Sequence, residues 1–148
     1  MADLQIVVFN LNVEVCGVDT SQIKQIIKYQ EITKVPKMPK FIEGMINLRG
    51  RVIPVINLNK RFEFGETELT KKTKIIITEI EGHPLGFLVN DVQELMKLSD
   101  ENIEVLPDLI HEAGNDYMKK VGKRGESLIT IVDLHAILTE SEMKRLKT

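Results

Sequence analysis

Tryptophan is absent from this sequence, and cysteine and the other aromatic residues are rare. Its 148 residues include two Tyr, five Phe and a single cysteine, Cys16. Proteins that bind single-stranded nucleic acid stack the bases on aromatic side chains along a basic groove, so this composition argues against that function. One cysteine excludes an internal disulfide and a multi-cysteine metal site, and it fits a reducing compartment.

The sequence also lacks a dominant charge and a long apolar run. Lys and Arg total 20 and Asp and Glu total 22, a net charge of -2, which gives no long-range field to gather nucleic acid or anionic lipid. Apolar runs such as residues 75–77 are far too short to span a bilayer. The N-terminus carries Asp3 where a signal peptide has a basic region. We therefore expect a cytoplasmic protein without direct membrane insertion.

Motifs for catalysis and for metal binding are missing as well. The three histidines, at positions 83, 111 and 135, are too widely spaced to share a helix face or a turn. The sequence contains no GxSxG, no HExxH and no glycine-rich phosphate loop between a strand and a helix. We expect no enzyme activity, no metal, no cofactor and no small-molecule substrate.

Lysine-rich stretches are the feature that keeps a second function class open. They occur at Lys34, Lys37 and Lys40, at Lys71, Lys72 and Lys74, and at Lys119, Lys120, Lys123 and Arg124. Solvated loops explain most such clusters. The alternative is a small nucleic-acid-binding β-barrel, which would show salt-sensitive binding to oligonucleotides.

The chain contains an internal repeat. Residues 6–28 match residues 75–97 without a gap at an offset of 69, so that Gly17 aligns with Gly86. Residues 49–58 match residues 124–134 if one residue is inserted after Gly125. Repeats of this length indicate duplicated structural units. The pattern predicts two similar β-rich subdomains in tandem, each too small to bury a good core alone.

Strands dominate the expected secondary structure. Segments 6–11, 52–58, 75–80 and 128–132 are rich in Val and Ile and are bounded by Gly, Pro or Asn. After Asp19 we expect a short turn and then a strand in which alternate side chains face opposite sides. Pro54 lies inside an expected strand and predicts an edge or a bulge, so that this strand is not central. The tail after Asp133 is predicted to be helical.

Arg49 lies in an expected hairpin turn, Asn47 to Gly50, between two apolar strands. An arginine in this position can pair with a nearby carboxylate or present its planar guanidinium to a partner. The position of Arg49 in the sequence does not decide between these two roles.

The run FIEGMINLRGRVIPVINLNKRF, residues 41–62, closely resembles the signature of the CheW family of chemotaxis coupling proteins. The resemblance extends from Leu4 to Leu146. It implies an all-β fold, mainly β with short helices: two tandem Src-homology-3-like five-stranded β-barrel subdomains that share a hydrophobic core, with a C-terminal helix. Residues 1–148 would form a single CheW-like domain. About 14–67 plus the C-terminal part would form one barrel and about 74–135 the second.

The resemblance also implies a non-enzymatic adaptor or scaffold. Such proteins bind the cytoplasmic tip of a chemoreceptor in the groove between the barrels and bind the regulatory domain of the histidine kinase CheA through barrel-end surfaces. They are cytoplasmic and join membrane receptor arrays through these partners. The receptor-binding candidates carried over by position are Ile23, Gln25, Gly44, Arg49, Ile75 and Val92. Leu109 is the candidate contact with the kinase or with a neighbouring coupling domain.

Two residues depart from the family's usual pattern. Gln25 stands where the family more often has Glu, and Asn90 stands where it more often has Asp. If the usual glutamate pairs with the signature arginine, Arg49 loses an ionic partner here and keeps at most a neutral hydrogen bond, which is weaker.

Overall fold

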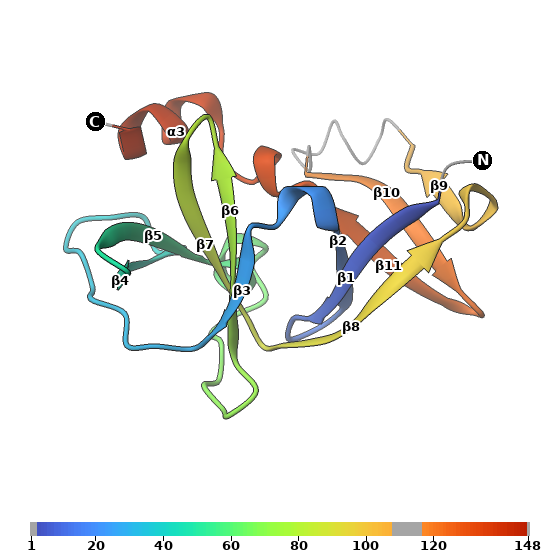
Figure 1. Ribbon diagram of the computed structural model, residues 1–148, viewed down its shortest axis with the longest axis horizontal. Helices are drawn as coiled ribbons and strands as arrows, with labels where there is room; N and C mark the ends of the chain where they lie inside the picture. The colour runs from blue at the N-terminus through green and yellow to red at the C-terminus, as the bar shows by residue number, and fades with distance from the viewer. Residues whose placement is uncertain (1–2, 108–116, 148) are drawn as a thin grey trace. The chain divides into compact units, whose positions relative to one another are not determined.

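The computed structural model describes residues 3–107 and 117–147 (Figure 1). Its strands are β1 (Leu4–Asn10), β2 (Val15–Asp19), β3 (Gln25–Lys28), β4 (Ile42–Leu48), β5 (Arg51–Asn57), β6 (Lys74–Ile80), β7 (His83–Val89), β8 (Asp91–Leu98), β9 (Ile103–Val105), β10 (Met118–Arg124) and β11 (Ser127–Val132). The helical elements are short: η1 (Thr20–Gln22), α1 (Leu58–Arg61), η2 (Asp100–Asn102), η3 (Leu134–Ala136) and α3 (Glu140–Lys147). The expected class, mainly β with short helices and a C-terminal helix, is confirmed.

The strands form two sheets. One has six strands in the order β8-β1-β2-β11-β10-β9, and the other has five in the order β3-β6-β7-β5-β4. Most neighbouring pairs are antiparallel, but β11 pairs with β2 in parallel and β5 pairs with β7 in parallel. The chain divides into two compact units. Unit 1 comprises residues 1–9, 14–22 and 93–148, and unit 2 comprises residues 10–13 and 23–92.

The sequence repeat corresponds to a repeat of strands whose third member changes sheet. The first copy supplies β1, β2 and β3, and the second copy supplies β6, β7 and β8. β3 joins the sheet of β6 and β7, whereas β8 joins the sheet of β1 and β2. Each sheet therefore draws strands from both halves of the sequence.

The parallel strand pairs have the same register in both units. Val55 of β5 lies opposite Gly86 of β7, and Ile131 of β11 lies opposite Gly17 of β2. In the sequence repeat, Gly17 is the equivalent of Gly86, and Ile131 is the equivalent of Val55. A β-carbon on either glycine would crowd an isoleucine side chain at 3.0 Å or less. The glycines thus allow core isoleucines to pack directly on the strand backbone.

Each unit has its own apolar cluster of β-branched and leucine side chains. In unit 2 the buried members are Ile46, Ile53, Val55, Ile75, Ile77 and Leu88. In unit 1 they are Ile6, Val8, Leu98, Ile129 and Ile131. These residues come from alternate positions of their strands, which is the pattern of a sheet face turned toward a core.

The chain that follows β3 reaches the outer edge of β4. The backbone groups of Thr33 and Met45 exchange two hydrogen bonds of 2.9 Å, which link this segment to β4 at the far edge of the sheet order. Gly44 permits the approach, because it has a φ of 147° and a β-carbon there would stand 2.1 Å from the Thr33 carbonyl oxygen. This bridge covers the edge of β4 at Met45 but leaves the second edge of β3 without a described strand partner.

The prediction that the strand containing Pro54 is not central is wrong. β5 lies between β7 and β4 in the sheet. Pro54 is tolerated because it pairs with Met45 of β4 on one side, whereas β7 pairs with β5 only from Val55 onward. The missing N–H of proline therefore costs no ladder hydrogen bond with β7.

The expected helical tail is present and is capped by its own sequence. The Thr139 hydroxyl accepts a hydrogen bond from the Glu142 backbone N–H at 3.2 Å, and the Glu142 carboxylate accepts one from the Thr139 N–H at 2.8 Å. This reciprocal pair is a capping box and explains why α3 begins at Glu140. Asp133 caps η3 by accepting from the His135 N–H at 3.0 Å.

Nothing in the described residues forms a helix that is both long enough and apolar enough to cross a membrane.

Candidate functional site

Arg49 occupies the tip of the hairpin between β4 and β5. Leu48 and Arg51 form the last strand pair, so Arg49 and Gly50 are the two loop residues, with φ values of 52° and 86°. Two positive φ values define the type I′ turn that suits a twisted hairpin. The Asn47 side-chain oxygen accepts from the Gly50 N–H at 3.0 Å and fixes the turn. The expected hairpin is confirmed.

The guanidinium of Arg49 is exposed and has no carboxylate partner among the residues that the structure describes. The neighbouring Arg51, by contrast, lies 3.8 Å from Glu79. A long side chain in a left-handed backbone conformation carries a steric cost that glycine and asparagine largely avoid. The hairpin therefore holds an unpaired planar cation at a defined position, where it can bind a carboxylate or a carbonyl group.

Gln25 is the first residue of β3, and Ile23 lies two residues before it; β3 and β4 are at opposite ends of the sheet order. Gln25 pairs with Ile77 of β6, and the backbone N–H of Lys24 donates to the Ile77 carbonyl at 2.8 Å. Ile23 and Gln25 are half-buried, whereas Lys24 is exposed. The expected turn, strand and alternation of faces are confirmed for this segment.

Gly44 and Ile75 are internal. Gly44 is buried where β4 meets the Thr33 backbone, and Ile75 has no exposed surface and packs in the apolar cluster of unit 2. Neither residue faces solvent. Both therefore act by supporting the strands that carry the other candidates.

Val92, the last residue of unit 2, is half-buried in β8. It follows Asp91, whose carboxylate accepts a hydrogen bond from the Asn10 side chain at 2.5 Å. Leu109, the candidate for the kinase contact, lies outside the described residues.

Within unit 2 the structure brings the Arg49 turn close to the chain that continues β3. The Gln30 side chain donates to the Asn47 carbonyl at 3.1 Å, and Tyr29 and Leu48 pack against the same apolar cluster. Gln25 lies at the other end of β3, and no hydrogen bond joins it to Arg49 among the described contacts. Arg49 and β3 are therefore parts of one unit, and the conditional neutral hydrogen bond between Arg49 and Gln25 is not among the described contacts.

A buried polar network is centred on Asn59 of α1, and no sequence motif predicted it. Asn59 is completely buried, and its side chain accepts from the Asn12 N–H and donates to Thr67 and Asn90, all at 2.8 Å. The Asn90 side chain in turn donates to Asn12 at 2.9 Å. Buried polar groups that are fully paired specify one arrangement of the chain. The network attaches residues 10–13 to unit 2, and Asn90 acts in it as a neutral partner.

An ion pair extends this network. The Glu43 carboxylate accepts from Lys60 at 2.8 Å and from the buried Asn57 side chain at 3.1 Å. Burial alone would raise the pKa of Glu43, but the hydrogen bonds from Lys60 and Asn57 outweigh it and lower that pKa below its usual value. The hydrogen bond to Glu43 likewise raises the pKa of Lys60. The signal available in the sequence was the run NLNKRF, whose two asparagines flank a single leucine.

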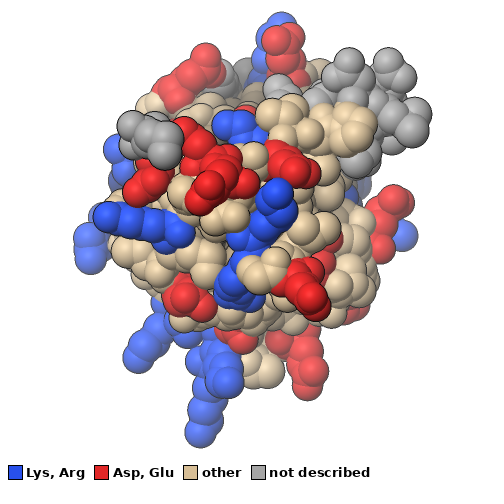
Figure 2. All heavy atoms as spheres, turned by 90° about the vertical axis from the view of Figure 1, so that its right-hand side faces the viewer, with Lys and Arg blue, Asp and Glu red and all other residues tan. Residues whose placement is uncertain are grey.

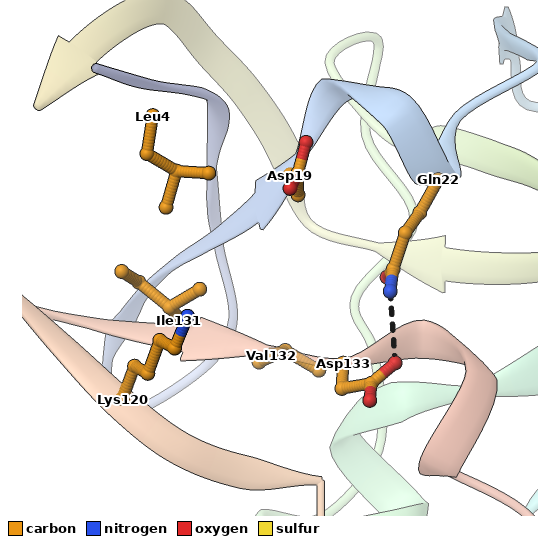
Figure 3. Close-up of a pocket in the computed structure, with 7 residues that line it drawn as sticks. All are labelled: Leu4, Asp19, Gln22, Lys120, Ile131, Val132 and Asp133. Atoms are coloured by element: carbon orange, nitrogen blue, oxygen red, sulfur yellow. Dashed lines mark hydrogen bonds between the residues drawn. The ribbon is translucent and has the colours of Figure 1, made fainter. Parts of the chain in front are cut away.

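Unit 1 contains a pocket of about 160 Å³ (Figure 3). The residues that line it are Leu4, Asp19, Gln22, Lys120, Ile131, Val132 and Asp133. The Gln22 side chain spans the turn: it donates to the Asp133 carboxylate at 2.8 Å and accepts from the Leu134 N–H at 2.8 Å. These bonds tie η1 to the end of β11, and the two carboxylates and Lys120 leave the pocket with mixed charge. No grouping of His, Cys, Asp and Glu side chains over residues 3–107 and 117–147 is arranged to hold a metal ion.

The surface of the molecule is mixed in charge on the face drawn in Figure 2, where Lys and Arg side chains lie among Asp and Glu side chains. Ion pairs within unit 1 join Lys123 to Glu104 at 3.1 Å and Arg124 to Glu94 at 3.4 Å. Cations of the third lysine-rich stretch are thus partly neutralised, which weakens the case for a nucleic-acid surface there.

Comparison with known proteins gives a consistent result. A family model described as CheW-like domain matches residues 5–142. The chemotaxis protein CheW of Treponema pallidum (strain Nichols) is 31% identical over 146 residues, which cover 96% of this chain and 86% of that protein. The chemotaxis protein CheW of Bacillus subtilis (strain 168) is 32% identical over 134 residues, which cover 90% and 86%.

A solved structure matches the fold as well. The scaffolding protein TtCheW from Thermoanaerobacter tengcongensis superimposes with a TM-score of 0.83 and 37% sequence identity. The match covers 94% of this chain and 90% of that one.

Proposed function

This chain belongs to the CheW-like domain family of chemotaxis scaffold proteins, and from that premise we propose that it couples transmembrane chemoreceptors to the histidine kinase CheA. In this role it binds the cytoplasmic tip of a receptor and the regulatory domain of the kinase and catalyses no reaction. The receptor-binding surface includes the Arg49 turn, the start of β3 and Val92. Leu109 is the proposed contact with the kinase or with a neighbouring coupling domain.

The observation that supports this proposal best is the state of Arg49. Its backbone is in a conformation that disfavours a long side chain, its turn is fixed by Asn47, and its guanidinium has no carboxylate partner in the described part of the chain. Strained residues that persist without a structural partner are typical of functional surfaces. A receptor helix that offers a carboxylate or a carbonyl group would supply the missing partner.

The apolar side of the contact comes from Ile23 and Val92. Both side chains are half-buried, so each can lose its remaining exposed surface when a helix packs on it. In helix-in-groove recognition a few apolar anchors supply most of the affinity, while a charged residue at the edge fixes orientation. Ile23 and Val92 fit the first role, and Arg49 fits the second.

Titration with a receptor-tip fragment tests the proposal. Arg49→Ala and Val92→Asp are each expected to weaken binding on the order of tenfold or more, as hot-spot residues do. Arg51→Ala is the matched control, because Arg51 belongs to the same hairpin and is already paired with Glu79. Circular dichroism establishes that each variant is folded. Unchanged affinity of folded Arg49→Ala and Val92→Asp proteins would show that the proposed surface is wrong.

Kinase coupling is tested separately. Autophosphorylation of CheA with receptor-containing membranes is expected to rise when the wild-type protein is added and to rise much less with Arg49→Ala. If the wild-type protein binds neither the receptor fragment nor the kinase regulatory domain, the coupling function itself is excluded.

A further inference from the structure

The two units differ in charge. Unit 2 contains twelve Lys and Arg residues and eight Asp and Glu residues, a net charge of +4, whereas unit 1 contains eight and fourteen, a net charge of -6. The small net charge of the whole chain conceals this difference. A local excess of one sign on a surface selects partners of the opposite sign.

Four of the twelve cations of unit 2 lie where β3 ends and β6 begins. Lys28 of β3 lies directly opposite Lys74 of β6. The ammonium group of Lys74 donates to the Lys72 carbonyl at 3.1 Å, and the Tyr29 N–H donates to the Thr73 carbonyl, so the turn before β6 is held beside β3. Lys71, Lys72 and Lys28 are exposed. We call Lys28, Lys71, Lys72 and Lys74 the lysine edge.

None of these four lysines pairs with a carboxylate among the described residues. Elsewhere in the protein cations do pair, as Lys60 does with Glu43 and Lys123 with Glu104. Like charges directly opposite each other on neighbouring strands destabilise a sheet. The Lys28–Lys74 pair is therefore a cost to the isolated protein, and an anionic partner would relieve it.

The surroundings of the lysine edge favour a polypeptide as that partner. Nucleic-acid sites of this kind need exposed aromatic side chains, but in unit 2 Tyr29, Phe41, Phe62 and Phe64 are half-buried and Phe87 is buried. The guanidinium of Arg61 already covers the Phe41 ring at 4.5 Å. Ile26, two residues before Lys28 and on the same face of β3, is 36% exposed. An isolated apolar side chain beside cations is too little for stable membrane binding.

β3 also has a free edge. It is the outermost strand in the order of the five-stranded sheet, and no described strand pairs with its second edge. An open edge next to alternating Ile26 and Lys28 side chains can accept an extended segment as a further strand. We infer that the lysine edge and β3 form a docking surface for an extended acidic segment of a partner protein, with its carboxylates at Lys28 and Lys74 and an apolar side chain at Ile26. The inference does not depend on which protein the Arg49 turn binds.

A peptide of alternating Glu and Val tests this inference against a peptide of alternating Gln and Val of the same length. Fluorescence anisotropy is expected to show binding of the Glu peptide, weakened by salt, and no comparable binding of the Gln peptide. The double variant Lys28→Glu/Lys74→Glu is expected to bind the Glu peptide on the order of tenfold less tightly or worse. Lys28→Gln/Lys74→Gln is a second variant that lowers the positive charge without reversing it.

Lys97→Glu is the matched control. Lys97 is the equivalent of Lys28 in the sequence repeat, it is exposed, and it belongs to the acidic unit 1, so its charge reversal is expected to leave peptide affinity unchanged. Equal loss of affinity in Lys97→Glu and in the double variant would overturn the inference, as would peptide binding that neither double variant weakens. It would also be overturned if the Lys28 and Lys74 variants lost affinity for an oligonucleotide or for phosphatidylserine vesicles while the wild-type protein ignored the Glu peptide.

Discussion

Gly44 approaches the Thr33 carbonyl so closely that a β-carbon on Gly44 would lie 2.1 Å from the oxygen. The contact involves backbone atoms on both sides, which cannot move apart without breaking the two hydrogen bonds between Thr33 and Met45. Gly44→Ala is expected to lower the free energy of unfolding by roughly 3 kcal/mol, because it adds this clash to the cost of a positive φ. Urea denaturation followed by circular dichroism measures the change.

Gly82→Ala is the control for that prediction. Gly82 has a φ of 82°, and a β-carbon added to it would meet no atom within 4 Å, so this substitution carries the backbone cost alone, about 1 kcal/mol. Equal losses in the two variants would show that the Thr33 contact does not constrain Gly44.

Asn59→Ala is expected to destabilise unit 2 by roughly 2–4 kcal/mol, since it removes a completely buried side chain, the acceptor of the Asn12 N–H, and one hydrogen bond each from Thr67 and Asn90. Asn102→Ala, which deletes an exposed side chain bonded to Ser99, is expected to change stability by less than about 0.5 kcal/mol. Thermal unfolding of both variants measures the difference. A loss at Asn59 no larger than that at Asn102 would mean that the network contributes little to stability.

The Glu43–Lys60 pair predicts a pH dependence of stability. The folded pKa of Glu43 is lowered, so its contribution is present above the unfolded pKa of glutamate, about 4.3, and is lost as the pH falls through the lower folded value. The folded pKa of Lys60 is raised, so its contribution is present below about 10.4 and is lost as the pH rises through the higher folded value. Glu43→Gln is therefore expected to be less stable than the wild type at neutral pH.

Urea unfolding of the wild type and of Glu43→Gln at a series of pH values between about 2 and 7 measures this effect. The stability difference should shrink as the pH falls below about 4.3. A difference that stays constant over this range would show that the carboxylate charge of Glu43 is not what stabilises the pair.

Arg49→Asn is expected to raise the free energy of unfolding by about 0.5–1 kcal/mol, because asparagine adopts the left-handed conformation of this turn more readily than arginine. If Arg49 serves partner binding, the same variant should bind the receptor fragment more weakly. Chemical denaturation and titration on one protein sample measure both quantities. A variant that is less stable than the wild type would mean that the arginine side chain stabilises the hairpin through contacts of its own.

Cys16 is expected to be inert in the native protein. The side chain has no exposed surface, and burial, together with the nearby Glu14 carboxylate, raises the pKa of the thiol far above its usual value. Labelling with a thiol reagent should be on the order of 10³-fold slower in the native protein than in urea, because it requires opening of the structure. Comparable rates in the two conditions would show that β2 opens readily.

Much of the fold follows from the sequence because the repeat and the Val- and Ile-rich segments are strong signals. The Asn47–Gly50 hairpin, the turn before β3 and the capped C-terminal helix are local features set by a few neighbouring residues, and all three are confirmed. Strand partners are a different matter. The repeat predicts the order of the strands along the chain. Whether β3 pairs with β2 or with β6 depends on contacts between residues about 50 positions apart, and no local pattern specifies such contacts.

The candidate site was predictable only where a local sequence pattern specifies it. Arg49 stands out by its place in a tight turn, and the half-burial of Ile23 and Gln25 agrees with the expected alternation along β3. The interior position of Ile75 could not be foreseen, because β6 is buried on both faces and its apolar run shows no alternation. The network around Asn59 joins residues 12, 67 and 90, which only the folded chain brings together.

Each copy of the repeat places its third strand, β3 or β8, in the sheet of the other copy. This arrangement bears on how the chain evolved. A polypeptide with one copy of the repeat could complete neither sheet by itself, because its third strand would have no place beside its own first two. Two such polypeptides that traded their third strands would build both sheets as a domain-swapped homodimer. Fusion of the two genes would then convert that dimer into the present single chain, in which unit 1 is acidic and unit 2 is basic.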